Sequence, residues 1–480
     1  MQDSSSSRRA IAVALLVAGA FFMEMLDGTV ITTAIPRMAQ SFGTNPIALN
    51  VGITGYLLTL AMLIPMSGWI TDRFGSRVVF GSAIAIFTLS SVLCGFCQNL
   101  PEFTCARILQ GVGGAMMVPV GRLVVLRSTA KRDLVTAIAY ITWPALVAPI
   151  IGPPLGGFIT TYATWRWIFF LNVPLGMIAF LCTLIIIPNE RLEEPKPFDW
   201  VGFVLSGVSC GTLIFGLDMV GRPGGTTLQS IPLLAVASVL GWLAIRHFKS
   251  APNPLIDLSA MRVPTFAITI LGASLFRIGI GATPFLMPLF FQLGFGMSPV
   301  KSGTLILAVF AGNLLMKPAT TPVLRWFGFR NVLLWNGVLC AASFVACCFF
   351  TATTSVALLM VVLFFGGLTR SMQFTCLNAV GFADIPAEEM SAASTLSSTV
   401  QQVTFAAGVA FGAIALRLSS VARGSSGATP SVFDFRVAFG FVTLFTVASL
   451  VDYYFMPNNA GQEVSGHRRQ QLQPALAEEG

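Results

Sequence analysis

The sequence is poor in charged residues, which make up only 10% of its 480 positions, whereas 55% are hydrophobic and the mean hydropathy is +0.80. Soluble globular domains carry about 25% charged residues. The scarcity of charge therefore excludes a soluble globular protein and leaves no room for a large soluble domain. It indicates an integral membrane protein.

Residues that serve many enzymes are also scarce. The chain has two histidines, His247 and His467, and both are expected at the cytoplasmic edge of the protein. None of its five lysines stands in a Gly-rich loop that ends in Gly-Lys-Ser/Thr, the sequence that cradles nucleotide phosphates. We therefore expect neither an enzyme nor a protein driven by ATP, and no bound cofactor.

The nine cysteines fall within or beside apolar runs, where Cys behaves as a small hydrophobic residue. Cys94 and Cys97 have the spacing of metal ligands. No second pair and no nearby histidine accompany them, so we expect no metal site.

Long apolar runs recur from Ala10 to the neighbourhood of Met456. A bilayer core needs about 20 residues per helix, so these runs predict an all-α membrane protein with 14 transmembrane helices. They are expected at about residues 10–33, 47–70, 78–98, 101–125, 134–160, 166–187, 201–219, 231–247, 264–291, 301–325, 331–350, 354–379, 391–417 and 434–456. The pattern predicts an N-terminal six-helix bundle (1–190), a linker with two additional helices (191–262), a C-terminal six-helix bundle (263–458) and a tail (459–480).

Basic residues in the loops predict the orientation. An even number of spans places both termini on one side, and most loop cations fall on that side, including Arg8, Arg73, Arg122 and Arg127. By the positive-inside rule, both termini and the tail are cytoplasmic. The same distribution accounts for the net charge of +8, so we expect no nucleic-acid partner.

Two acids, Glu24 and Asp27, lie inside the first apolar run. A carboxylate near the middle of a membrane helix costs about 2.5 to 3.5 kcal/mol, so such residues usually have a function. Being three residues apart, they share a helical face, and each raises the cost of ionising the other. We expect one of them to hold a proton near neutral pH. In the alternative, Asp27 caps a local break before Gly28 and Glu24 faces a water-filled vestibule without function.

Arg107 is a buried cation at a similar depth in the fourth run. It needs an acidic partner, and Asp27 or Glu24 is the acid available in the first half. Protonation of that acid would break the pair and switch helix packing, which is the minimum chemistry of a proton-coupled carrier. The alternative is a permanent structural ion pair.

The loop segments Gly68–Arg77 and Thr321–Arg330 each follow the second helix of a six-helix half, and they share a glycine (Gly75, Gly328) and a final arginine. This placement indicates a degenerate internal repeat. In the first copy, Asp72 is expected to pair with Arg73 or Arg77 as a cytoplasmic latch that opens in one state. The alternative is a simple positive anchor.

Five motifs in order resemble the major facilitator superfamily, and within it the 14-helix drug:proton antiporters of the QacA and EmrB type. They are Leu26–Val30 with the following Ala34–Pro36, Gly68–Arg77, Arg107–Gly114, Gly152–Gly157 and Trp165–Pro174. The stretches Thr283–Gly296 and Met372–Asp384 are most similar to the MdtD and HsrA branch. The resemblance implies two pseudo-symmetric bundles and a proton-coupled antiporter that exports small molecules, as in multidrug efflux, by alternating access. It also implies the inner membrane of a bacterium and a monomer.

The fifth helix carries the antiporter motif of the resembled family. Its residues are Pro149, Gly152, Pro153, Gly156 and Gly157. The resemblance implies that this helix lies between the halves and marks exporters. By themselves these residues predict a kinked and closely packed helix.

Polar residues at membrane depth in the second half are candidates for cargo binding: Arg277, Lys317, Arg370, Gln373, Asn378 and Gln402. Unpaired cations are expensive there, so we expect them to line a watery cavity that favours an anionic or zwitterionic cargo. Alternatively, some of them snorkel or pair with carbonyl groups. The other functions left open are an exporter of anionic metabolites or metal chelates and, from another class, a membrane sensor or channel.

Overall fold

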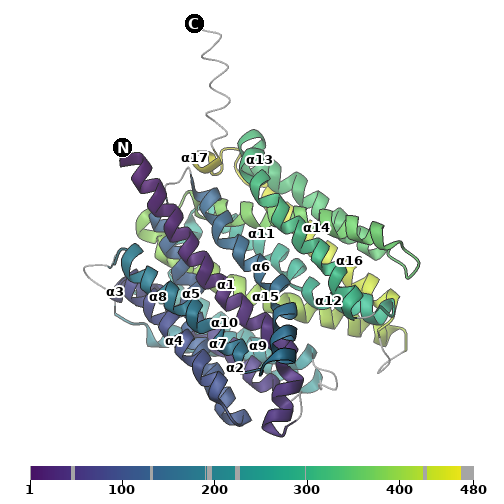
Figure 1. Ribbon diagram of the computed structural model, residues 1–480. Coiled ribbons are helices and arrows are strands. Elements are labelled where there is room, and N and C mark those ends of the chain that lie inside the picture. The colour runs from purple at the N-terminus through teal and green to yellow at the C-terminus, as the bar shows by residue number, and fades with distance from the viewer. Residues whose placement is uncertain are drawn as a thin grey trace, which may run out of the picture.

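The computed structural model describes residues 2–44, 49–129, 133–189, 191, 197–221, 227–297, 299–424 and 430–465. These residues form helices and no strand (Figure 1). The all-α class predicted from the apolar runs is therefore confirmed. Part of the predicted linker (192–196 and 222–226) and the tail beyond residue 465 lie outside the described residues.

The first half contains eight α-helices and a short 3-10 turn. They are α1 (Gln2–Phe42), α2 (Asn50–Leu63), η1 (Ile64–Met66), α3 (Ser67–Phe74), α4 (Ser76–Phe96), α5 (Leu100–Ser128), α6 (Leu134–Tyr162), α7 (Trp167–Phe170) and α8 (Asn172–Ile186). The N-terminus and the short helix α17 (Gln462–Ser465) lie at the same end of the bundle, which we call the terminal side (Figure 1). The opposite end is the far side.

Two helices connect the halves, α9 (Trp200–Gly221) and α10 (Thr227–Ser250). The second half follows with η3 (Ser259–Arg262), α11 (Pro264–Gly281), α12 (Thr283–Leu289), the π-helical turn η4 (Phe290–Gly294), α13 (Pro299–Cys348), α14 (Val356–Ala383), η5 (Ala387–Glu389), α15 (Met390–Ala422) and α16 (Val432–Tyr454).

Among the described residues, 12 helices are long and apolar enough to cross a membrane. One of them, Lys301–Cys348, consists of two helices merged across Gly328, where the backbone is not helical. Helix α6 is not among the 12, and the side chains of its residues 143–146 are not described. The count of 14 spans therefore stays a prediction.

The internal repeat has a structural counterpart. Gly75 and Gly328 both have positive φ angles, 90° and 72°, which only glycine adopts without strain. Two residues after each glycine, an arginine donates to a backbone carbonyl near the end of its own half: Arg77 Nε to Ile187 O (2.6 Å) and Arg330 Nη2 to Tyr454 O (2.8 Å). The two halves thus close their terminal-side loops in the same way.

The α9–α10 pair is fastened by Asp199, which lies just before α9. Its Oδ1 accepts hydrogen bonds from the Gly202 amide (2.8 Å) and shares a 2.8 Å contact with His247 Nε2 on α10. Its Oδ2 accepts the Leu255 amide of the following loop (3.0 Å). One carboxylate thus fixes the start of α9, the end of α10 and the segment that leads to α11.

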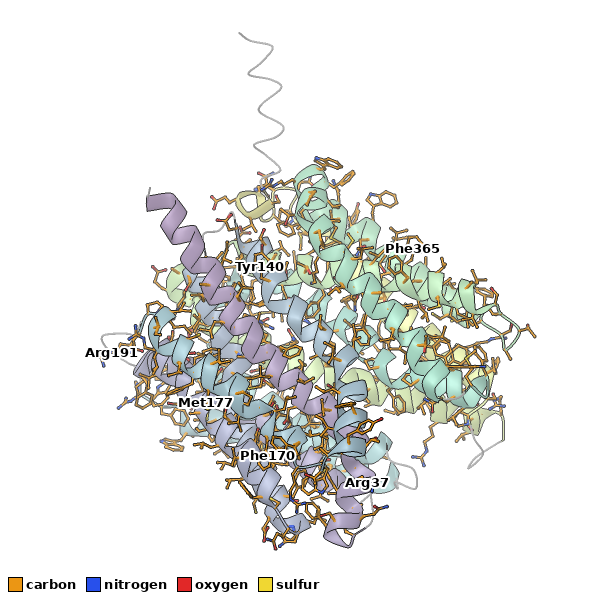
Figure 2. All side chains as sticks on the ribbon, viewed as in Figure 1. Arg37, Tyr140, Phe170, Met177, Arg191 and Phe365 are labelled. Carbon is orange, nitrogen blue, oxygen red and sulfur yellow. The ribbon has the colours of Figure 1, made fainter. Side chains whose placement is uncertain are left out.

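Side chains on the outside of the bundles are largely apolar. Met177 and Phe365 point outward from the two halves (Figure 2), and each is 58% exposed. In water such exposure would be costly, whereas lipid tails accept it. The outer surface therefore fits a bilayer.

Candidate functional site

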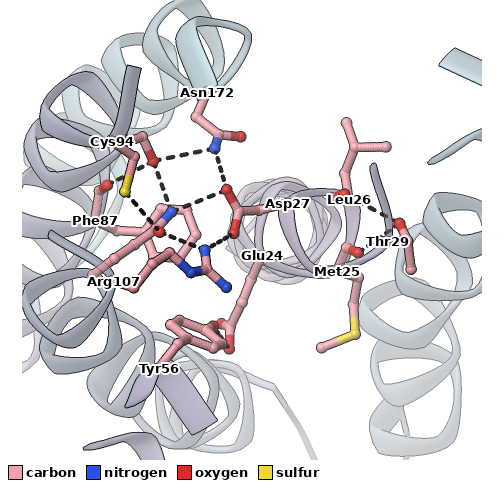
Figure 3. Close-up of polar contacts among 12 residues, drawn as sticks. Glu24, Met25, Leu26, Asp27, Thr29, Tyr56, Phe87, Cys94, Arg107 and Asn172 are labelled. Atoms are coloured by element: carbon pink, nitrogen blue, oxygen red, sulfur yellow. Dashed lines mark hydrogen bonds and ion pairs between the residues drawn. The ribbon is translucent and has the colours of Figure 1, made fainter. Parts of the chain in front are cut away.

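Asp27 is the centre of a buried polar network (Figure 3). Its side chain is 1% exposed, and its Oδ2 accepts a 2.6 Å hydrogen bond from Arg107 Nη1. Its Oδ1 accepts from two amides, Gln110 Nε2 (3.0 Å) and Asn172 Nδ2 (2.9 Å). Burial of an ion pair is tolerated only when such additional donors satisfy the charge. Both carboxylate oxygens are accordingly occupied.

A second layer of contacts ties this network together. Arg107 Nη1 also donates to Gln110 Oε1 (2.6 Å). The amides of Gln110 and Asn172 both donate to Ser91 Oγ, at 2.8 and 3.1 Å. The Asp27 carboxylate of α1 therefore bonds directly to side chains of α5 and α8, and these two helices are joined to Ser91 of α4. A change in the charge of Asp27 would alter the hydrogen bonds of this network on α4, α5 and α8.

Glu24 has different surroundings. Its Oε1 accepts the Tyr56 hydroxyl (3.2 Å), while its Oε2 is buried without a hydrogen-bond partner among the described residues. The Tyr56 ring lies 4.3 Å from the Arg107 guanidinium carbon, a cation–π contact. The sequence left open whether Asp27 or Glu24 pairs with Arg107, and the geometry selects Asp27. Glu24 is a separate acid that is joined to the same arginine through an aromatic ring.

Glycines of α5 allow these helices to approach. A Cβ at Gly113 would lie 2.7 Å from the Phe87 amide of α4, and one at Gly111 would lie 2.8 Å from the Tyr56 carbonyl of α2. At Gly114 it would lie 2.9 Å from the Tyr56 hydroxyl. The motif Arg107–Gly114 therefore supplies the charged residue and the close packing that holds its partners in place.

Helix α6 packs against α1 two residues beyond Asp27. A Cβ at Gly152 would lie 2.3 Å from Thr29 Oγ1, whereas one at Gly157 would meet nothing within 4 Å. Thr29 points away from Asp27, toward the opposite side of α1 (Figure 3). The carbonyl of Gly156 accepts the Thr160 hydroxyl. Of the antiporter motif, Gly152 is thus the glycine in close contact with α1.

The side chains of the remaining motif residues, Pro149 and Pro153, lie outside the described set.

The predicted partners of Asp72 were wrong. Asp72 Oδ1 accepts from Arg127 Nη2 of α5 (3.0 Å), whereas Arg77 donates to the Ile187 carbonyl and Arg73 stacks over the Trp69 ring (5.4 Å). The reason is geometric: Asp72 lies in the last turn of α3, and the turn at Gly75 carries Arg77 away toward the end of α8. The pair of Asp72 with Arg127 joins α3 to α5.

The three cations predicted for the second half are buried, and each lies on a different helix. Arg277 of α11 is 1% exposed, and its Nε and Nη1 have no partner among the described residues. Lys317 Nζ of α13 donates to Thr375 Oγ1 (2.7 Å). Arg370 of α14 donates to Thr283 Oγ1 (3.5 Å) and stacks on Phe344 (4.6 Å). No acid forms an ion pair with them in the described ranges.

The polar residues predicted beside these cations do not gather around them. Gln373 uses its amide between helices: it donates to the Leu333 carbonyl (3.1 Å) and accepts from Asn336 (2.7 Å). Asn378 donates to the Phe374 carbonyl of its own helix (2.7 Å). Gln402 is half-buried on α15. The Gln373 contacts join α14 to α13, whereas the Asn378 contact lies within α14. Cargo binding by all three residues stays a prediction.

Sequence reasoning missed several residues of the site. Gln110 and Asn172 bond to Asp27, and Ser91 bonds to both of them. Gln110 and Asn172 lie in the motifs Arg107–Gly114 and Trp165–Pro174, which was a signal for them, whereas the signal for Ser91 was a polar side chain in an apolar run. Arg122, expected near the terminal-side end of the helix at 101–125, also makes a contact that the sequence did not predict. It is 8% exposed on α5, which continues to Ser128, and its Nη2 donates to Gln401 Oε1 of α15 (3.3 Å).

Metal ligands do not cluster in the part of the chain that the structure describes, since no group of three or more His, Cys, Asp or Glu side chains fits an ion. The Cys94 thiol lies 3.9 Å from Gln110 Oε1, at the edge of the Asp27 network.

The chain matches a family of membrane transporters. The family model of the Major Facilitator Superfamily matches residues 17–409, and the chain belongs to that superfamily. Within it, the chain is a multidrug-type transporter of the MdtD branch, a multi-pass membrane protein and not an enzyme.

Curated relatives support this placement over most of the chain. A protein of Escherichia coli named "Putative multidrug resistance protein MdtD" is 35% identical over 458 residues, which are 95% of this chain and 96% of the relative. A protein of Serratia proteamaculans with the same name is 37% identical over 403 residues, 83% of each chain.

Solved structures share the fold. The proton:xylose symporter XylE superposes with a TM-score of 0.65 at 15% identity, covering 97% of this chain and 99% of the other. The human organic anion transporter MFSD10 (TETRAN) superposes with a TM-score of 0.64 at 13% identity, covering 93% and 99%. At these identities the likeness concerns the fold alone.

Proposed function

We propose that the chain is a proton-coupled antiporter that exports small molecules by alternating access, with Asp27 as the proton carrier. The observation that carries this proposal is a buried carboxylate whose two oxygens bind donors from α5 and α8 and whose charge is matched by Arg107. A proton on Asp27 would remove the negative charge that holds these donors. The helices would then be free to repack.

Glu24 is proposed as a second acid of the coupling site. It lies one helical turn from Asp27, and its hydrogen bond to Tyr56 places it next to the ring on which Arg107 stacks. A change at either acid therefore reaches the same arginine. Protons are the proposed coupling ion, and no cofactor is invoked.

We further propose that the protein acts as a monomer in the bacterial inner membrane, with both termini cytoplasmic. The orientation is supported by the basic loop residues on the terminal side. In this orientation, the ion pair of Asp72 with Arg127 lies at the cytoplasmic ends of α3 and α5.

The test is transport in proteoliposomes with an imposed pH gradient, using ethidium as a cationic probe and citrate as an anionic one. We expect gradient-driven accumulation of a probe by the wild type and its loss in Asp27→Asn. A matched control is Asp384→Asn, which changes an exposed acid at the end of α14 and should leave accumulation unchanged. Accumulation that ignores the gradient, or that survives Asp27→Asn, would refute the coupling.

A second candidate cargo class is anionic, and Arg277, Lys317 and Arg370 favour it. These buried cations have no acidic partner in the described ranges, so an anion would relieve a real electrostatic cost. In the same liposomes, transport of citrate but not of ethidium, abolished by Arg277→Gln, would select this class.

A further inference from the structure

A large cavity lies beside the two connecting helices, away from the Asp27 network. It has a volume of about 1110 Å³. Its walls are formed by α9, α10, the segment after α10 with η3, the start of α11 and the first turns of α15. Pockets for drug-sized ligands usually measure about 300 to 1,000 Å³. The cavity therefore has room for a larger molecule.

The depth of the cavity matches one half of a bilayer. Its deepest lining residues are Leu213 on α9, Ala237 on α10 and Val403 on α15. Each lies 13 residues from the terminal-side end of its helix, at Trp200, Ser250 and Met390 respectively. At about 1.5 Å per residue, the cavity reaches about 20 Å inward, slightly more than half of a hydrocarbon core of about 30 Å. Counted from their terminal-side ends, the three helices give the same distance.

The inner walls of the cavity offer apolar surface. Their hydroxyl groups are already used by the backbone: Ser206 donates to the Gly202 carbonyl (2.7 Å), Ser209 to the Ala237 carbonyl (2.8 Å) and Thr399 to the Thr395 carbonyl (2.9 Å). Leu213, Val400 and Val403 add apolar side chains to these walls. A hydrocarbon chain that contacts these walls leaves the hydroxyl hydrogen bonds of Ser206, Ser209 and Thr399 intact.

The mouth of the cavity, on the terminal side, is polar and carries an excess of positive charge. Lys249 and Arg262 line it and are exposed, and Asp257 is the single acid in the lining. The Asp257 carboxylate accepts the Ser259 amide (2.8 Å), while Ser259 Oγ is buried without a hydrogen-bond partner among the described residues. Nearby, His247 is engaged by Asp199. The side chains of Lys249 and Arg262 and the Ser259 hydroxyl can therefore bind an anionic group.

We propose that this cavity binds a phospholipid with an anionic headgroup, which lies against Lys249, Arg262 and Ser259 while an acyl chain extends between α9, α10 and α15. Charge complementarity at the mouth and one-leaflet depth select this occupant over a small soluble anion, which would leave the apolar walls unfilled. The lipid would fill the space between the connecting helices and the second half. This inference is independent of proton coupling.

The experiment is a thermal-unfolding titration of the full-length protein in detergent. Phosphatidylglycerol is compared with phosphatidylcholine of the same chains and with free glycerol phosphate. We expect phosphatidylglycerol alone to raise the Tm in a saturable manner, because it is the only one of the three with both an anionic headgroup and acyl chains. In Lys249→Gln/Arg262→Gln the apparent Kd should weaken by at least about tenfold.

Two further variants separate this site from general attraction of anionic lipid. Arg191→Gln/Arg325→Gln removes two exposed cations outside the cavity lining and should leave the titration unchanged. Ser238→Trp adds bulk at an exposed position of the cavity lining and should abolish saturation. Equal stabilisation by phosphatidylcholine, stabilisation by glycerol phosphate alone, or an unchanged Kd in the Lys249/Arg262 variant would each overturn the proposal.

Discussion

Two acids three residues apart on α1 have unlike surroundings, and that difference distinguishes their roles. Asp27 has a cation and two amide donors, whereas Glu24 has one neutral hydroxyl donor and one unpartnered oxygen. Breaking a buried pair by removing one partner costs about 3 to 5 kcal/mol, because the other charge remains buried. Measurements of the free energy of unfolding should therefore show which of the two acids is paired with Arg107.

Arg107→Ala is expected to lower the free energy of unfolding by about 3 to 5 kcal/mol, since it leaves the Asp27 carboxylate buried without its cation. The double variant Arg107→Ala/Asp27→Asn should recover part of this loss, whereas Arg107→Ala/Glu24→Gln should not. Thermal unfolding of the purified variants measures both. Equal recovery by the two double variants would contradict the assigned pairing.

The pairing of Arg107 with an acid of α1 could be predicted from the sequence, because a buried arginine needs an acid and few were available. The amide donors of Gln110 and Asn172 could not be predicted. Asn172 is separated from Asp27 by 145 positions, and which residues of α8 face α1 depends on the rotation of both helices. The pairing of Arg127 with Asp72 could not be predicted for the same reason.

At the scale of elements, α1 is held between a polar face and a small-residue face. The Asp27 face contacts α5 and α8, while Thr29 abuts Gly152 of α6. The sequence predicted a closely packed fifth span from its glycines, but it could not tell Gly152, which touches α1, from Gly157, which faces open space. That distinction requires the position of the neighbouring helix.

Gly152→Ala is expected to destabilise the protein by about 1 to 3 kcal/mol, because the new Cβ would overlap Thr29 Oγ1 at 2.3 Å. Gly157→Ala is the matched control on the same helix and should be neutral. Adding Thr29→Ala to Gly152→Ala removes the oxygen at 2.3 Å but keeps the Cβ of residue 29 at 2.9 Å, so it should restore part of the Tm. Failure of this rescue would show that the α1–α6 contact is not the cause.

Asp199 gives the α9–α10 pair a pH dependence. Burial by itself raises the pKa of Asp199, but hydrogen bonds from the Gly202 and Leu255 amides and from His247 outweigh it and hold the pKa below its ordinary value. The stabilisation is therefore present above the unfolded-state pKa of about 3.9 and is lost as the pH falls through the lower native value.

Thermal unfolding measured from pH 6 down to pH 3 should show this loss in the wild type. Asp199→Asn should have a lower Tm at pH 6 and a shallower decline on acidification. An identical slope for the two proteins would show that Asp199 does not contribute to the acid sensitivity.

At the scale of the whole molecule, the two halves meet on the terminal side. Ser394 donates to the Pro119 carbonyl (3.3 Å), Arg122 donates to Gln401 (3.3 Å), and a Cβ at Gly68 would lie 2.4 Å from Thr395 Oγ1. The apolar cluster on the far side of the first half contains residues of that half alone. The structure is accordingly closed on the terminal side.

The architecture was the most predictable level, because each membrane span must satisfy its own backbone and bury or expose apolar side chains over a fixed length. The spans expected at 301–325 and 331–350 accordingly lie on either side of Gly328, where the backbone of α13 is not helical. Which side is closed could not be predicted, since the contacts that close it join residues some 275 positions apart.

Arg122→Gln is expected to favour opening of the terminal side, because it weakens the contact with Gln401. The opening is measured with Ser394→Cys in a protein from which the exposed Cys105 has been removed. Because Ser394 is 1% exposed, the rate at which a maleimide labels this cysteine reports the opening. We expect a severalfold faster reaction. Arg417→Gln, an exposed cation toward the other end of α15, should leave the rate unchanged, and a rate unaffected by Arg122→Gln would contradict the role of this contact.

The most direct test of proton coupling is to record proton and cargo movement together in liposomes that contain a trapped pH indicator and no imposed pH gradient. A probe moving down its own gradient should drive protons in the opposite direction through the wild type. In Asp27→Asn this proton movement should be absent while probe binding remains. Probe movement without proton movement in the wild type, or full proton movement in Asp27→Asn, would contradict a coupling mechanism centred on Asp27.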